Sequence, residues 1–148
     1  MSTTPIAHPE LHARIESSFV RQGMMLHLGA RLVSVAPGEV EIALPYSERV
    51  TQQQGGYHGG AMGALADIAA GYAGLTLAAE GQEVTTVEYK INFLAAFQGG
   101  ELRARGHVVR AGKRLIITTA EVVHLNDDGG ESPCALMQQT LATVKQSY

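Results

Sequence analysis

The sequence predicts an α+β domain in which a curved antiparallel β-sheet wraps around a long central helix. One observation is the apolar segment 60–79, which has the length of a helix and carries a single charge, Asp67. A second is a series of four strand-like runs after it, joined by short turns rich in Gly, Asn and Asp. A third is that a helix apolar on every side needs cover on every side, which a curved sheet supplies. Other α+β arrangements fit the same pattern.

The segment 9–22 is expected to form a first amphipathic helix. Leu11, Ile15 and Phe19 recur at helical spacing, and Pro9 suits a first turn.

Strand-like runs flank the central helix on both sides. The first two are joined by the turn dipeptide Pro37-Gly38, and apolar and polar residues alternate in the second. Gly81 is the expected cap after the central helix. The expected strands cover residues 31–36, 39–44, 84–94, 101–110, 114–125 and 134–144.

The chain of 148 residues is long enough for one domain, and we expect an N-terminal helical segment over 1–27 before a single domain over 28–148. The net charge of −3 argues against nucleic acid as a main partner. The lone Cys134 requires no oxidising compartment, and the first ten residues carry no secretory pattern, so a cytoplasmic location is expected. Asp67 and many Ala and Gly residues speak against a membrane span in the central helix.

The junction of loop and helix at residues 51–74 carries the most chemical information. Gly59 and Gly60 lack a Cβ, so an acyl group can approach the backbone there. The first turn of a helix has unpaired N–H groups, which can stabilise a developing oxyanion. Asp67 follows two turns later among apolar residues, a setting that enzymes use for general bases and nucleophiles. A structural Asp that binds a neighbouring loop or hydroxyl fits the pattern equally.

This segment resembles the hotdog-fold thioesterases of the phenylacetyl-CoA (PaaI-like) and 4-hydroxybenzoyl-CoA groups. The chain reads His58-Gly59-Gly60 and then Leu65-Ala66-Asp67, and the family motif is a His-Gly-Gly turn with an acidic residue nine positions after the His. The resemblance extends through residues 86–94 and 108–114 and covers roughly 28–144. It implies the hotdog fold and hydrolysis of an acyl-CoA to a free acid and CoA. The Asp, in place of Glu, resembles the PaaI-like group.

The resemblance also implies roles for single residues. Asp67 activates water or attacks the thioester carbonyl directly, and the Gly59 N–H polarises that carbonyl. His58 shapes the turn and is not the expected base. Thr86 matches a hydroxyl residue that positions the water. Gln52 occupies a position where many members have Asn, and its longer side chain can make the same kinds of hydrogen bond.

Further residues are expected to contact the substrate. The residues expected beside the acyl group are Gly60, Tyr57, Met62 and Phe93. The basic residues expected to bind the CoA phosphates are Arg110, Lys113 and Arg114, for which a solvated hairpin tip is the alternative.

The resemblance further implies that each site lies between two subunits of a homodimer, and that dimers pair into a homotetramer. No metal or other cofactor is expected, because His8 and His12 lack a third ligand and no nucleotide-binding glycine loop is present. A non-catalytic acyl-CoA binding or sensing protein remains the main alternative, motivated by Gln52. A hotdog dehydratase fits less well, because those relatives place a His with Asp or Glu in other motifs.

Overall fold

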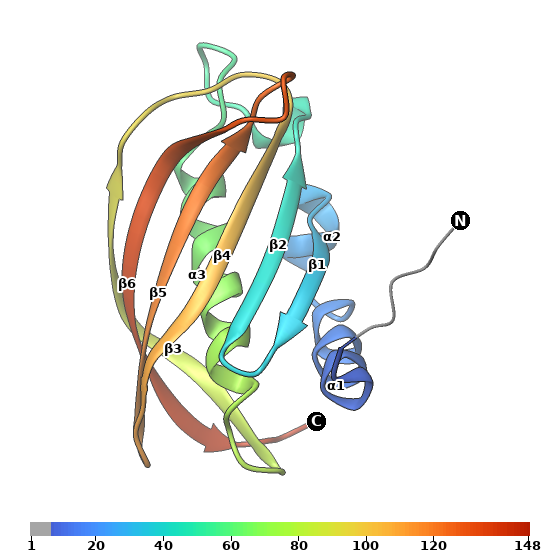
Figure 1. Cartoon of the computed structure of the whole chain (residues 1–148), viewed down its shortest axis with the longest axis vertical. Coiled ribbons are helices and arrows are strands. Elements are labelled where there is room, and N and C mark those ends of the chain that lie inside the picture. Colours follow the sequence, from blue (N-terminus) through green and yellow to red (C-terminus); the bar gives the residue numbers. More distant parts are fainter. Residues whose placement is uncertain (1–6) are drawn as a thin grey trace.

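A computed structural model describes residues 7–148, so residues 1–6 of the expected N-terminal segment lie outside the described residues. A six-stranded antiparallel sheet curves around the long helix α3, which confirms the predicted hotdog fold (Figure 1). The strand order is β1-β2-β4-β5-β6-β3. The elements are α1 (Pro9–Phe19), α2 (Gly23–Leu28), β1 (Arg31–Ala36), β2 (Glu39–Pro45), η1 (Glu48–Val50), α3 (Gly59–Leu75), β3 (Gln82–Phe93), β4 (Glu101–Ala111), β5 (Leu115–Leu125) and β6 (Glu131–Lys145).

Two expected helix boundaries were wrong. The first helix ends at Phe19, because Gln22 adopts an extended conformation and a separate short helix, α2, begins at Gly23. The central helix α3 ends at Leu75, four residues before the expected end. The Thr76 hydroxyl donates to the carbonyl of Ala73 at 2.6 Å and accepts from the backbone N–H of Gly38 at 2.7 Å, which ties the helix end to the β1–β2 turn.

Gly81 therefore does not cap α3. Its φ of +76° belongs to the turn that leads into β3, where the N–H of Gln82 donates to the carbonyl of Ala79. The glycine supplies the left-handed conformation that this turn requires. Gly81 was thus expected at the end of α3, but its left-handed conformation serves the turn before β3.

One face of α3 consists of small residues because the sheet lies against it. Ala66, Ala69 and Ala73 are fully buried. A Cβ added to Gly106 of β4 would lie 2.3 Å from the carbonyl oxygen of Ala69, so strand and helix backbones are in close contact here. These alanines therefore serve packing, which was one of the two roles that their size allowed.

Strand β3 forms one edge of the sheet. It pairs with β6 on one side, and within residues 7–148 no strand pairs with its other side. Three apolar side chains of this strand, Val87, Tyr89 and Phe93, are 43–58% exposed. A long edge strand with exposed apolar side chains is suited to pairing with another chain.

No helix in the described part of the chain is long and apolar enough to cross a membrane.

Candidate active site

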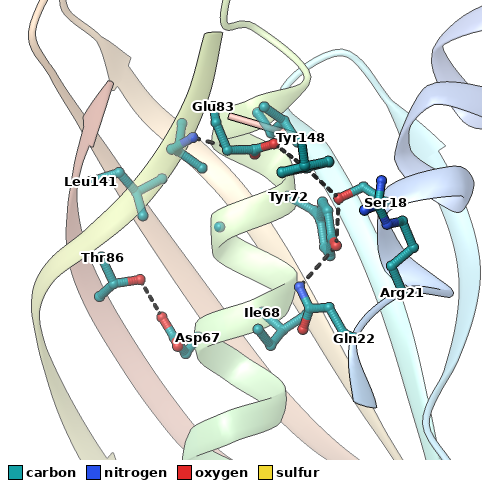
Figure 2. A pocket seen from close by; sticks show the side chains of 13 residues that line it. Ser18, Arg21, Gln22, Asp67, Ile68, Tyr72, Glu83, Thr86, Leu141 and Tyr148 are labelled. Carbon is teal, nitrogen blue, oxygen red and sulfur yellow. Dashed lines mark hydrogen bonds between the residues drawn. The ribbon is translucent and has the colours of Figure 1, made fainter. Parts of the chain in front are cut away.

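Asp67 projects from α3 toward β3, where the Thr86 hydroxyl donates a hydrogen bond of 2.7 Å to its Oδ1 (Figure 2). A β-bulge at Val87 makes this contact possible, because the β3–β6 register shifts between Thr86 and Glu88. Residues two apart on a regular strand share a face, whereas here Thr86 faces the helix and Glu88 accepts a hydrogen bond from Thr140 on the opposite face. The bulge thus directs the predicted hydroxyl at the predicted carboxylate.

Gln139 of β6 is a second partner of Asp67 that the sequence analysis missed. Its side chain is 1% exposed, and its Nε2 donates to Asp67 Oδ1 and, at 3.3 Å, to the Asp67 carbonyl. The Gln139 Oε1 in turn accepts from the fully buried Thr118 hydroxyl at 2.9 Å. Because a carboxylate only accepts hydrogen bonds, Asp67 takes the Nε2 end of the amide and leaves the Oε1 end to accept from Thr118. The two contacts at Oδ1 hold Asp67 in one orientation.

The other carboxylate oxygen of Asp67 is available for chemistry. Within residues 7–148 no donor is bonded to Oδ2, and this atom is not among the buried unpaired ones. It therefore has access to the adjoining pocket. A carboxylate with one oxygen fixed and the other open can accept a proton from a water molecule or attack a carbonyl carbon.

The His-Gly-Gly turn forms the N-terminus of α3. The Gly60 N–H donates to His58 Nδ1 at 2.7 Å, so His58 caps the helix with its ring. An imidazole that accepts at Nδ1 carries its proton at Nε2. Among the described residues no acceptor is bonded to the Gly59 N–H, which leaves it free as the donor expected for an oxyanion. The ring of Phe93 lies 3.3 Å from the position of a Cβ at Gly59, so Phe93 covers this turn.

The free amide and the carboxylate of one chain cannot serve the same thioester. Asp67 lies eight residues after Gly59 on α3. At about 1.5 Å per residue the two groups are roughly 12 Å apart along the helix. An oxyanion donor and a general base must each lie about 3 Å from the reacting group. The Gly59 N–H and the Asp67 carboxylate of one chain are thus too far apart along the helix to contact one thioester group together.

A pocket of about 440 Å³ adjoins Asp67 and Thr86. It follows α3 past Gly71 to Tyr72, and residues from α1 and from beyond β6 close its far end (Figure 2). Of the residues that line the pocket, only Asp67 and Thr86 were predicted as part of the site. The lining residues are Ser18, Arg21, Gln22, Asp67, Ile68, Gly71, Tyr72, Leu75, Glu83, Val84, Thr86, Leu141 and Tyr148.

Three other predicted site residues lie away from this pocket. Tyr57 and Met62 are buried, 2% and 5% exposed, and the Tyr57 hydroxyl donates to the carbonyl of Gly100 at 3.1 Å. Burial raises the pKa of Tyr57, as expected for a core phenol. Tyr57 and Met62 are therefore not among the residues that line this pocket, and their contact with the acyl group stays a prediction. Gln52 uses its Oε1 to accept from the Gln54 N–H within their own loop.

The basic residues predicted to bind CoA phosphates are exposed around the β4–β5 hairpin tip, and their phosphate contacts stay a prediction. They are Arg110, Lys113 and Arg114. A hollow of about 1000 Å³ on the sheet face away from α3 contains none of the predicted site residues. Within residues 7–148 no three His, Cys, Asp or Glu side chains gather as metal ligands do.

The comparisons with known proteins agree with the fold. Residues 54–131 match the family model of the thioesterase superfamily. A thioesterase family protein from Silicibacter pomeroyi is 38% identical, with a TM-score of 0.87 over 92% of this chain and 99% of that protein. A protein of Saccharolobus solfataricus that is named provisionally as an esterase is 32% identical over 94 residues, which are 64% of this chain and 66% of the relative.

The PaaI protein of the E. coli phenylacetic acid degradation operon is 20% identical, with a TM-score of 0.81 over 93% of this chain and 96% of that protein, and shares its fold. The fold and the match to the family model define a thioester hydrolase. The chain belongs to the thioesterase superfamily and has the hotdog fold.

Proposed function

We propose that this protein hydrolyses an acyl-CoA to a free acid and CoA, with Asp67 as the general base. The observation that carries the proposal is the Asp67 carboxylate, whose Oδ1 is fixed by Thr86 and Gln139 while Oδ2 opens on the pocket. Water attacks the thioester carbonyl carbon and gives its proton to Oδ2. The C–S bond then breaks, and the leaving CoA thiolate takes the proton back from Asp67 Oδ2, which restores the carboxylate. Direct attack by Asp67 is the alternative route to the same products.

We further propose that the oxyanion donor comes from a second copy of the chain. The roughly 12 Å between Gly59 and Asp67 along one helix supports this, because the two groups of one chain cannot contact one thioester group together. The open edge of β3 is where a second copy would pair, and the exposed Val87, Tyr89 and Phe93 support that choice. The homodimer is then the smallest active unit, and we expect two dimers to associate into a homotetramer.

The direct test is hydrolysis of a panel of acyl-CoAs by the wild type and by Asp67→Asn, followed through release of the CoA thiol. Asn keeps the shape of Asp67 and cannot take up the proton, so we expect a loss of about 10²–10⁴-fold in kcat. The variant should keep the oligomeric state and thermal stability of the wild type. Wild-type rates in Asp67→Asn would refute the mechanism. Tight acyl-CoA binding by a wild type without turnover would instead identify the non-catalytic binding protein.

The shared site can be tested with Gly59→Pro, which removes the free N–H and keeps the helix. Proline is tolerated at the first helical position, and His58 already has φ −69° and ψ 135°, the conformation required before proline. Mixed dimers of Gly59→Pro and Asp67→Asn chains contain one intact site if each site takes its two groups from different chains. We expect activity to return on mixing. Mixed dimers as inactive as both parents would show that each site uses one chain.

A further inference from the structure

Residues 146–148, which follow β6 and are called the strap below, run along the far end of the pocket beside Asp67. The Gln146 N–H donates to the carbonyl of Gly81 at 2.9 Å, which extends the pairing of β6 with β3 by one residue. Tyr148 then lines the pocket (Figure 2). The strap therefore places a phenol ring at the end of a pocket that begins at Asp67.

Tyr148 is held from two sides of the pocket. Its hydroxyl donates to the Glu83 carboxylate of β3, because a carboxylate has no proton to donate. The same hydroxyl contacts the Ser18 hydroxyl of α1 at 3.2 Å. The Arg21 guanidinium lies over the ring, 4.6 Å from its centre, which is a cation–π contact. The ring thus connects α1 with β3, and because it is 55% exposed it covers the pocket from the solvent side.

The polar groups at this end of the pocket bind one another and the strap, whereas the walls nearer Asp67 are apolar. Besides Tyr148, Ser18 contacts the Tyr72 hydroxyl at 3.1 Å, which accepts from Gln22 Nε2 at 2.9 Å. The apolar wall residues are Ile68, Leu75 and Leu141. An apolar acyl tail can therefore lie along these walls until it meets the ring of Tyr148.

The distance from Asp67 to the strap sets the length of the tail that fits. Tyr72, which lines the same end as the strap, follows five residues after Asp67, roughly 7.5 Å along the helix axis. Glu83 lies three residues before Thr86 on β3, roughly 10 Å along the strand. An extended alkyl chain advances about 1.3 Å per carbon, because C–C bonds are about 1.5 Å long. The pocket thus accommodates roughly six to eight carbons before the strap.

We propose that Tyr148 determines specificity by limiting the length of the acyl group that this protein hydrolyses. The inference rests on the proposed acyl-CoA hydrolysis. Acyl groups that end before the strap bind with the ring in place, whereas longer ones must displace the ring from Glu83, Ser18 and Arg21. Tyr148 acts on the choice of substrate and takes no part in the proton transfer at Asp67.

The test is hydrolysis of straight-chain acyl-CoAs from butanoyl to dodecanoyl by the wild type and by Tyr148→Ala. We expect the wild-type kcat/KM to fall at least about tenfold from octanoyl-CoA to dodecanoyl-CoA, since even one methylene that does not fit has this effect in a closed pocket. Tyr148→Ala removes the ring, so the ratio of kcat/KM for dodecanoyl-CoA to that for butanoyl-CoA should rise at least about tenfold. An unchanged ratio would overturn the inference.

Leu136→Ala is the matched control. It also removes an exposed side chain, but from the hollow on the opposite face of the sheet. We expect the ratio of the two kcat/KM values to stay at that of the wild type. An equal rise of this ratio in Leu136→Ala and Tyr148→Ala would show a general loosening of the fold and would overturn the role of Tyr148.

A double variant tests whether the acyl tail reaches the strap through this pocket. No atom lies within 4 Å of a Cβ added to Gly71, so Gly71→Leu places its side chain in the open space between Asp67 and the strap, and Leu is a better helix former than Gly. We expect Gly71→Leu to abolish the gain in long-chain hydrolysis that Tyr148→Ala produces. The same gain with and without Gly71→Leu would overturn the assignment of the tail to this pocket.

The outcomes separate this inference from the proposed function. Hydrolysis with the same dependence on acyl length in the wild type and in Tyr148→Ala overturns the role of Tyr148 and leaves the thioesterase mechanism in place. Absence of hydrolysis of every thioester overturns both.

Discussion

Replacement of Gln139 by Met should damage both stability and catalysis, for different reasons. Met has a similar length and no hydrogen-bonding amide, so the cavity stays filled while Asp67 loses one of its two side-chain donors and keeps Thr86. The buried Thr118 hydroxyl also loses its acceptor. An unpaired buried hydroxyl costs about 1–3 kcal/mol, and a lost hydrogen bond to a charged group about 1.5–3 kcal/mol. We expect a loss of about 2–5 kcal/mol in the free energy of unfolding.

The catalytic loss should follow from the freed carboxylate. If the hydrogen bond from Gln139 orients Asp67 in the transition state, about 1.5–3 kcal/mol corresponds to a decrease of roughly 10–150-fold in kcat. Binding of substrate does not involve Gln139, so KM should change little.

The double variant Gln139→Met with Thr118→Val separates the two effects. It removes both members of the Thr118–Gln139 hydrogen bond, so no hydroxyl is left unpaired in the core. We expect it to regain about 1–2 kcal/mol of stability relative to Gln139→Met, with kcat remaining low. Urea unfolding and steady-state kinetics on the same preparations give both quantities. Wild-type kcat in either variant, or recovery of kcat together with stability, would refute an orienting role for Gln139.

Three further expectations address single contacts. Thr86→Val should lower kcat by about 10-fold while Thr86→Ser, which keeps the hydroxyl bound to Asp67, should lower it less; equal losses would contradict the role of the hydroxyl. Gly106→Ala should cost at least about 1–3 kcal/mol in urea unfolding, because its Cβ would clash with the Ala69 backbone, whereas Gly71→Ala should gain up to about 1 kcal/mol. Burial raises the pKa of the Cys134 thiol to about 11, so at pH 8 native protein should react with Ellman's reagent only as fast as it unfolds. Burial of the neutral thiol contributes its full stabilisation below the unfolded pKa near 8.5, and this contribution is lost as the pH rises through 11. Rapid modification of the native protein at pH 8 would contradict the burial of this thiol.

The sequence predicted those features whose signals are local. The His58 cap, the free first-turn amide and Asp67 lie within ten consecutive residues, and a helix keeps such residues in fixed relation. The strands were found because their alternation and their turn residues are also local. Gln139 was missed although it interrupts an apolar series of inward-facing residues on β6, between Met137 and Leu141. A polar residue at such a position indicates a buried partner, but the partner lies 72 residues away and the sequence does not name it.

The far end of the pocket had no local signal. Ser18 and Gln22 belong to the N-terminal helical segment, and Tyr148 lies at the opposite end of the sequence. Tertiary packing brings them together over Tyr72, whose ring lies 6.0 Å from that of Phe19. The sequence analysis placed residues 1–27 in a segment apart from the hotdog domain, so it did not consider Ser18 and Gln22 as residues that line a pocket beside Asp67.

Helix α3 has one face that packs against the sheet and another that lines the pocket, and the two faces differ in how large a side chain they can accommodate. Ala69 and Ala73 face the sheet, where the backbone of β4 leaves no room for a larger side chain. Asp67 and Gly71 are four residues apart, so they share the face that opens on the pocket. A change of volume on the first face acts on folding, whereas a change on the second face alters the space beside Asp67. Under the proposed acyl-CoA hydrolysis, we therefore expect substitutions at residue 71 to change which acyl groups are hydrolysed without disturbing the contact between helix and sheet.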